Sequence, residues 1–216
     1  MGYPDLMKIT QDKPIGLIAD SHGKTDLLIK SIRALNDAGA ETIIHLGDIC
    51  DSLAPDTAEE ALHILREHSI HGVLGNNEYS MITDHHNEHV QNITDDSINY
   101  LKQMPYVICE GPIWFTHSAP FNWPAATRRP ITEFLPHLVE EASFPFTILF
   151  RGHSHQPSII QINDKETKKI PAQTGKRQKL CRNMRYVVTV GAVEDGSSAL
   201  FLPEEYEILF LNIGRI

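Results

Sequence analysis

Short apolar runs recur along this chain, and each ends at a group of polar residues. Five of them lie within residues 15–23, 42–50, 71–78, 112–120 and 146–155. Runs of four to six apolar residues that stop at glycine or polar residues are typical of strands buried on both faces. The pattern therefore predicts five buried strands with polar side chains at their carboxyl ends.

Helical periodicity lies between the first of these strands. Apolar positions at helical spacing are Leu28, Ile32 and Leu35 in one segment and Ala58, Ala61, Leu62 and Leu65 in the next. Thr25 and Asp26 are candidate N-caps of the first helix, and Gly39 is its stop signal. Such stripes predict helices that pack one face on a core. Residues 94–105 predict a shorter helix that is closed by Pro105.

The alternation of strands and helices predicts an α/β fold with its sheet inside. The tail, residues 157–213, is mostly strand-like, so it forms either a second sheet or the continuation of the first. The chain contains no repeat and no low-complexity linker, which favours a single domain over residues 1–216.

Composition narrows the class of protein. The 216 residues carry a net charge of −9, so we expect no broad nucleic-acid binding. No apolar run approaches the roughly 18 residues needed to cross a bilayer, and the N-terminus lacks the apolar core of a signal peptide. Three scattered cysteines, Cys50, Cys109 and Cys181, predict neither a disulfide framework nor a thiolate zinc site. We therefore expect a cytoplasmic protein without membrane contact.

The strand ends carry the candidate chemistry. Their polar residues are Asp20 and His22, then Asp48, then Asn76 and Asn77, then His117, and finally His153 and His155. Ligands of α/β proteins collect at the carboxyl ends of strands. The first four groups contain no lysine or arginine, so two neighbouring aspartates would need a divalent cation to balance their charge. Alternate residues of an extended segment face the same way, so D-x-H and H-x-H can each offer two ligands to one place.

The order of these motifs resembles a known family. The motifs are D-x-H (Asp20, His22), G-D (Gly47, Asp48), G-N-x-E (Gly75, Asn76, Glu78), a single histidine (His117) and G-H-x-H (Gly152, His153, His155). This set is similar to that of the calcineurin-like metallophosphoesterases, and the chain looks most like their compact bacterial and archaeal phosphodiesterases. The resemblance extends from Ile15 through residues 187–195. It implies a four-layer α/β/β/α sandwich of two mixed sheets flanked by helices, with two metals at one edge.

The resemblance also implies a role for each ligand position. The first metal would be held by Asp20, His22 and His155, the second by Asn76, His117 and His153, and Asp48 would bridge the two. Oxygen and imidazole ligands suit Mn²⁺, Fe or Zn²⁺ better than Ca²⁺. By the resemblance we expect Mn²⁺, with Fe, Zn²⁺ or Ni²⁺ as alternatives. The implied activity is hydrolysis of a phosphate ester by a hydroxide shared between the metals, without a serine nucleophile, so Ser21 and Ser154 are small polar spacers.

One position departs from the family pattern. Many relatives have G-N-H-[DE], and their histidine assists the leaving oxygen, whereas this chain has Asn77 there. Asparagine donates a hydrogen bond but does not titrate. Asn77 and His117 are thus the candidate catalytic residues, and a phosphodiesterase is favoured over a phosphomonoesterase or protein phosphatase. A second departure is Ser118, where relatives often have glycine.

Several alternatives stay open at this stage. The substrate is expected to be small and phosphorylated or nucleotide-like, so a dinucleoside polyphosphate hydrolase is a second candidate, and a non-hydrolytic scaffold of the same fold is a third. His85, His86 and His89 form either a solvated loop or a source of the missing acid. His45 has either a core role or one behind the ligands.

Two basic segments are also open to interpretation. The basic stretch from Lys168 to Arg185 is either a solvated hairpin or an edge that attracts anionic substrates, and Arg128 and Arg129 raise the same question.

Overall fold

The computed structural model describes residues 12–84, 93–119, 145–163 and 166–214. It contains two six-stranded mixed sheets, called sheet A and sheet B below. The strands of sheet A, in spatial order, are β3 (His71–Gly72), β2 (Thr42–His45), β1 (Ile15–Ile18), β11 (Ser197–Leu202), β12 (Glu207–Asn212) and β9 (Arg177–Lys179). Those of sheet B are β4 (Val107–Glu110), β5 (Ile113–Thr116), β6 (Ile148–Arg151), β10 (Arg185–Thr189), β7 (Ser158–Ile162) and β8 (Thr167–Ile170). The α/β fold with two mixed sheets flanked by helices is therefore confirmed.

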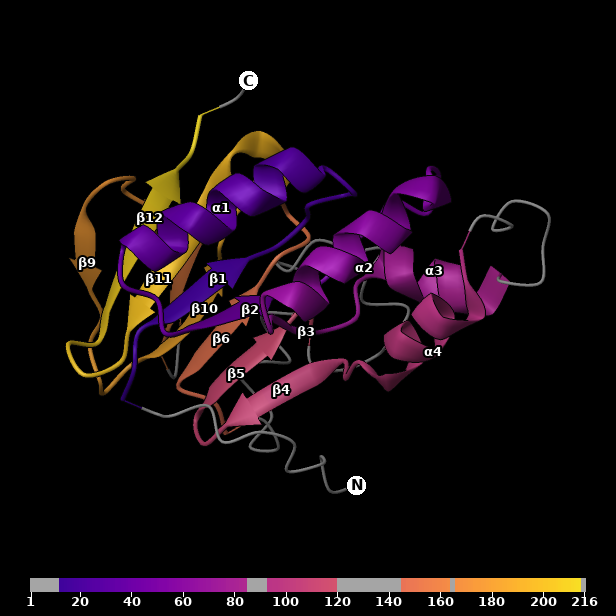
Figure 1. Cartoon of the computed structure of the whole chain (residues 1–216). Helices are drawn as coiled ribbons and strands as arrows, with labels where there is room; N and C mark the ends of the chain where they lie inside the picture. Colours follow the sequence, from indigo (N-terminus) through magenta and orange to yellow (C-terminus); the bar gives the residue numbers. More distant parts are fainter. Residues whose placement is uncertain (1–11, 85–92, 120–144, 164–165, 215–216) are drawn as a thin grey trace.

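Helices cover the outer face of sheet A in the described part of the chain. They are α1 (Thr25–Asp37), α2 (Ala58–Glu67), α3 (Asn76–Asp84) and α4 (Asp95–Gln103), with short 3₁₀ turns η1 (Pro55–Thr57) and η4 (Val193–Asp195). Figure 1 shows α1 and α2 side by side across this sheet, with α3 and α4 beyond its β3 edge. Among the described residues, no helix has the length and apolarity needed to span a membrane.

The predicted helical stripes are buried. Leu28, Ile32 and Leu35 of α1 pack in one apolar cluster with the buried residues of α2. The N-cap prediction for the first helix is wrong, because α1 begins at Thr25 and its N-cap is Lys24, without a side-chain cap. The helix predicted over residues 94–105 is α4, and the Thr94 hydroxyl caps it by accepting a hydrogen bond from the Ser97 N–H.

The strands of sheet A are apolar on both faces because helices cover one side of this sheet and sheet B covers the other. In β1, Leu17 faces the core between the sheets, while the next residue, Ile18, packs against the helices. That core is aromatic: the Phe150 ring lies 5.6 Å from that of Phe115 and 5.0 Å from that of Phe201, between ring centroids. A continuous apolar run is thus the expected sequence of such a strand.

The C-terminal strands divide between both sheets. β7 and β10 extend sheet B, whereas β11 and β12 extend sheet A. The tail therefore completes both sheets, and neither of the two predicted alternatives alone describes it.

The basic stretch that begins at Lys168 forms no hairpin, because its strands β8 and β9 are the outer strands of different sheets. Two strands separate β8 from β6, a span of about 14 Å at the usual strand spacing of about 4.8 Å. Exposed Lys168, Lys169 and Lys179 lie on these edges, where charge discourages pairing with another chain. This arrangement favours protection of the edges over attraction of substrate.

Candidate metal centre

The polar residues after β1, β2 and β6 have an unusual backbone conformation. Seven non-glycine residues of the described chain have a positive φ, and five of these are Asp20, His22, Asp48, His153 and His155, with φ from 44° to 67°. This left-handed region costs non-glycine residues on the order of 1–3 kcal/mol each, and such strain concentrates at functional sites. D-x-H and H-x-H therefore present their side chains from left-handed turns. The predicted alternation along an extended segment is wrong.

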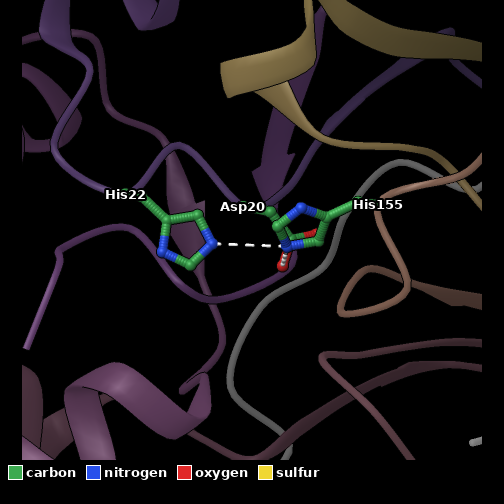
Figure 2. A group of neighbouring side chains, drawn as sticks. All are labelled: Asp20, His22 and His155. Carbon is green, nitrogen blue, oxygen red and sulfur yellow. Dashed lines mark hydrogen bonds and ion pairs between the residues drawn. The ribbon is translucent and has the colours of Figure 1, made fainter.

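Asp20, His22 and His155 form the first of two side-chain clusters (Figure 2). Nε2 of His155 lies 3.4 Å from Nε2 of His22 and 3.5 Å from Oδ1 of Asp20. Asp20 is fully buried, and both of its oxygens accept the His153 N–H, at 2.9 and 3.1 Å. Two imidazole nitrogens that face each other beside a buried carboxylate need a proton or a cation between them.

Asp48, His117 and His153 form the second cluster. Nε2 of His117 lies 3.1 Å from Nδ1 of His153, 3.4 Å from Oδ2 of Asp48 and 3.0 Å from Oδ1 of Asn76. Nδ1 of His117 lies 2.8 Å from the Leu46 carbonyl, which can only accept, so Nδ1 carries the proton. In neutral His117 the Nε2 lone pair then faces other acceptors. This is the donor set of a cation site.

Electrostatics agree with that interpretation. Burial disfavours a charged His117, yet the Asp48 carboxylate raises the pKa of His117 to about 9. Burial likewise disfavours a charged Asp48, but His117 holds the pKa of that carboxyl below its usual range. Burial, followed by the charge of His117, lowers the pKa of His153 to about 4. These side chains thus favour a positive charge between them, and without a cation a proton on His117 supplies it.

Asp48 lies between the two clusters. Its Oδ2 is 3.4 Å from Nε2 of His117 in the second cluster and 3.9 Å from Nε2 of His22 in the first. Its Oδ1 accepts the Asn77 N–H at 2.9 Å, and only 2% of the residue is exposed. One carboxylate therefore faces both groups of histidines.

Glu78 is a buried support that the sequence analysis noted only as a motif member. Its carboxylate accepts three backbone N–H groups, those of Gly75 at 2.8 Å and of Asp48 and Cys50 at 2.9 Å. Burial and the nearby charge of Asp48 raise the pKa of Glu78 to about 7. The signal for Glu78 in the sequence was its place as the acid of G-N-x-E. In the structure, its carboxylate joins the Asp48 loop to the start of α3.

Arg151 is a second buried support, and no sequence signal indicated its role. It is fully buried at the end of β6. Its Nε donates to the Ser118 carbonyl and its Nη1 to the Ser154 hydroxyl, both at 2.7 Å. Ser154 lies between the two histidines of G-H-x-H, so Arg151 ties that loop to the residue after His117. Ser154 therefore behaves as a held spacer, as expected.

Ser21 and His45 form another buried contact behind the first cluster. The Ser21 hydroxyl donates to the Ile49 carbonyl at 3.0 Å and lies 2.9 Å from Nε2 of His45. His45 is fully buried, and burial, followed by the charge of His117, lowers its pKa to about 3. Neutral His45 thus donates its Nε2–H to Ser21. His45 is therefore both a buried core residue and a support for the segment between Asp20 and His22, so both predicted roles apply.

Asn77 contacts the neighbouring loop. Its Oδ1 accepts both the N–H and the hydroxyl of Ser52, at 2.9 and 2.6 Å. The remaining candidates, His85, His86, His89, Arg128 and Arg129, lie outside the described residues.

Comparisons with known proteins agree with this geometry. The sequence matches the family model of the calcineurin-like phosphoesterase superfamily domain over residues 14–194. Curated proteins provide no sequence match. A metallophosphoesterase structure from Sphaerobacter thermophilus has a TM-score of 0.69 and 22% identity, over 94% of this chain and 89% of that chain.

Two further solved structures share the fold. One, described as "a putative diadenosine tetraphosphatase", has a TM-score of 0.61 and 16% identity, over 97% of this chain and 96% of that chain. A novel archaeal phosphodiesterase has a TM-score of 0.53 and 17% identity, over 92% and 99%. At these identities the likeness is one of fold.

The two clusters agree with the dinuclear-metal dependence of the family. Every residue of both clusters falls within residues 14–194, the range that the family model covers. The chain therefore belongs to the calcineurin-like phosphoesterase superfamily, and it is a metal-dependent phosphoester hydrolase.

Proposed function

We propose that this protein is a phosphodiesterase that works with two divalent cations on a small phosphorylated or nucleotide-like substrate. The observation that carries the proposal is the position of Asp48, whose Oδ2 faces histidines of both clusters. A carboxylate shared by two cation sites would hold the cations close together, and two-metal hydrolysis depends on that closeness.

The ligands divide by cluster. In this proposal, Asp20, His22 and His155 hold the first cation, while Asn76, His117 and His153 hold the second. Asp48 contributes to both. The mixture of imidazole, carboxylate and amide oxygen suits Mn²⁺, Fe, Zn²⁺ and Ni²⁺ alike, and we place Mn²⁺ first because of the family resemblance.

When bound, the two cations lower the pKa of a water and neutralise charge on phosphate oxygens. The protein prepares the site for them. The Leu46 carbonyl holds the proton of His117 on Nδ1, which leaves Nε2 free to coordinate. Asp20 accepts the His153 N–H and so fixes the loop that carries both histidines of G-H-x-H. A Cβ at Gly152 would lie 2.7 Å from Oδ2 of Asp20, so this close approach needs glycine.

Alanine at either histidine of G-H-x-H should weaken a different cation. We expect His155→Ala to lose the first site and His153→Ala the second, each by more than the roughly 10–100-fold that loss of an outer partner costs. A titration of the metal-free protein with Mn²⁺, followed by electron paramagnetic resonance, counts the sites that stay tight.

His63→Ala is the matched control, because the His63 side chain is 74% exposed on α2. This variant should keep both sites. If His153→Ala and His155→Ala both keep two tight sites, the ligand assignment is wrong.

The preference for diesters rests on Asn77. Its amide donates hydrogen bonds but does not titrate, and its Oδ1 accepts two hydrogen bonds from Ser52. General acid assistance is typically worth 10²–10⁴-fold and matters most for poor leaving groups. Activated diesters are therefore the favoured substrates. Dinucleoside polyphosphates are the second class to test, since the solved structures that share the fold include a diadenosine tetraphosphatase candidate as well as a phosphodiesterase.

Restoring histidine should help poor leaving groups selectively. In Asn77→His, Nδ1 takes about the place of Oδ1 and accepts from Ser52 while the ring is neutral, and Nε2, the nitrogen that would deliver the proton, extends beyond it. We expect up to about 10²-fold higher kcat/KM for alkyl esters, the lower end of the range for general acids, and little change for aryl diesters. The measurement is log kcat/KM against leaving-group pKa for both proteins.

Asn77→Gln provides the control, because it changes the size of the side chain without adding a titrating group. It should keep the slope of the wild-type protein. Equal slopes for wild type and Asn77→His would show that position 77 does not deliver the proton.

A further inference from the structure

The 3₁₀ turn η4 brings a third carboxylate to the first cluster. Oε1 of Glu194 lies 3.1 Å from Nδ1 of His155 and 3.8 Å from Nε2 of His22. Glu194 belongs to none of the motifs that the sequence analysis assigned to the site. Its side chain is 29% exposed, so it lies at the rim of the cluster.

Backbone hydrogen bonds hold the turn of this carboxylate against the segment that follows β1 and carries Asp20. The Val193 N–H donates to the Ala19 carbonyl at 2.8 Å, and the Glu194 N–H donates to the Asp20 carbonyl at 3.2 Å. The turn is closed by Gly196, whose φ of 80° ends it in the left-handed region. Glu194 and Asp20 are therefore placed together, although they lie far apart in the sequence.

The two nitrogens of His155 face different carboxylates. Nε2 lies 3.5 Å from Oδ1 of Asp20, inside the cluster, and Nδ1 lies 3.1 Å from Glu194, outside it. A histidine that binds a cation through Nε2 must keep its proton on Nδ1, and a carboxylate beside that proton fixes the ring and makes Nε2 more basic. At His117 of the second cluster, the group that faces Nδ1 is the Leu46 carbonyl and not a carboxylate, among the residues that the structure describes.

We propose that Glu194 is a positioning residue of the first cation site, which directs Nε2 of His155 to the cation and makes this site the tighter of the two. The proposal rests on the proposed function, because it takes Asp20, His22 and His155 as ligands. It adds an asymmetry to that function. Two carboxylates serve the first site alone, Asp20 within the cluster and Glu194 beside His155. The second site has the neutral amide of Asn76 and shares Asp48 with the first.

One-site proteins test this directly. His153→Ala leaves the first cluster as the intact site, and His155→Ala leaves the second. Adding Glu194→Gln to the His153→Ala protein should weaken Mn²⁺ binding about 10–100-fold, the usual cost of losing an outer-shell partner. Adding it to the His155→Ala protein should change the affinity less than about 2-fold. Equal losses in both backgrounds, or no loss in the first, would overturn the proposal.

Two further variants separate positioning from general charge. Glu205→Gln removes the same charge in the turn between β11 and β12 and should leave both affinities unchanged; an equal loss there would overturn the proposal. Glu194→Asp keeps a carboxylate on a shorter side chain and should bind Mn²⁺ more tightly than Glu194→Gln. If Asp and Gln are equally weak, the carboxylate is not the acting group and the inference fails.

The wild-type protein distinguishes this inference from the function on which it rests. If wild type binds none of Mn²⁺, Fe²⁺, Zn²⁺ and Ni²⁺, the proposed function fails. If wild type binds two ions and Glu194→Gln leaves the first unchanged, the proposed function stands and only the role of Glu194 is wrong.

Discussion

Asp48→Asn should reduce phosphodiester hydrolysis by roughly 10²–10³-fold, the loss typical when one group that stabilises developing charge is removed. Oδ2 of Asp48 faces His117 at 3.4 Å and His22 at 3.9 Å, so the substitution removes negative charge from both clusters at once. The asparagine retains Oδ1 as an acceptor for the Asn77 N–H, so the fold should survive. The measurement is kcat at saturating Mn²⁺, together with the number of bound ions.

Asp51→Asn is the matched control for this prediction. Asp51 lies in the same loop, and its Oδ1 accepts the Leu53 N–H at 2.8 Å, a bond that asparagine can also make. Its turnover should stay near that of wild type. An Asp48→Asn protein that binds two ions and turns over normally would rule out the shared role of Asp48.

Glu78→Ala should lower the free energy of unfolding of the metal-free protein by about 3–5 kcal/mol. The substitution leaves three buried N–H groups, those of Asp48, Cys50 and Gly75, without their acceptor, and each such loss costs about 1–3 kcal/mol before relaxation. Denaturant unfolding with a chelator present measures this cost without a contribution from bound cations. At this size, the melting temperature should fall by about 2–4 °C for each kcal/mol.

Glu60→Ala is the control for Glu78, since Glu60 is an exposed glutamate in the first turn of α2. Surface substitutions of this kind usually change stability by less than about 0.5 kcal/mol. A loss below about 1 kcal/mol in Glu78→Ala would mean that water or a shifted backbone satisfies the three N–H groups.

The sequence predicts the layers of this fold because the buried faces of strands and helices require apolar residues at regular spacings. Buried strands such as β1 appear as continuous apolar runs, and the stripe from Leu28 to Leu35 follows the buried face of α1. Which strands pair with each other is harder to predict. Nothing local to β8 and β9 indicates that they belong to different sheets, since strand pairing depends on residues far along the chain.

The same division applies to the site. Its ligand-type side chains could be predicted, because polar residues that follow buried strands collect at one edge of a sheet. Of their supports, only Glu78 had a signal in the sequence, its place in G-N-x-E, and the contacts that the supports make could not be predicted. Glu78 contacts the loop of Asp48, Arg151 contacts Ser118, and Glu194 contacts His155, and each contact joins residues at least 30 positions apart. Sequence spacing carries no signal for such pairs.

The left-handed backbone at Asp20, His22, Asp48, His153 and His155 limits how this protein can be made more heat-resistant. At each of these positions glycine would relieve a local cost on the order of 1–3 kcal/mol, but it would also delete a proposed ligand. Selection for a sturdier fold and selection for catalysis therefore oppose each other at the same five residues. Stabilising changes that spare turnover must lie elsewhere, in the helices, the core between the sheets or the outer strands.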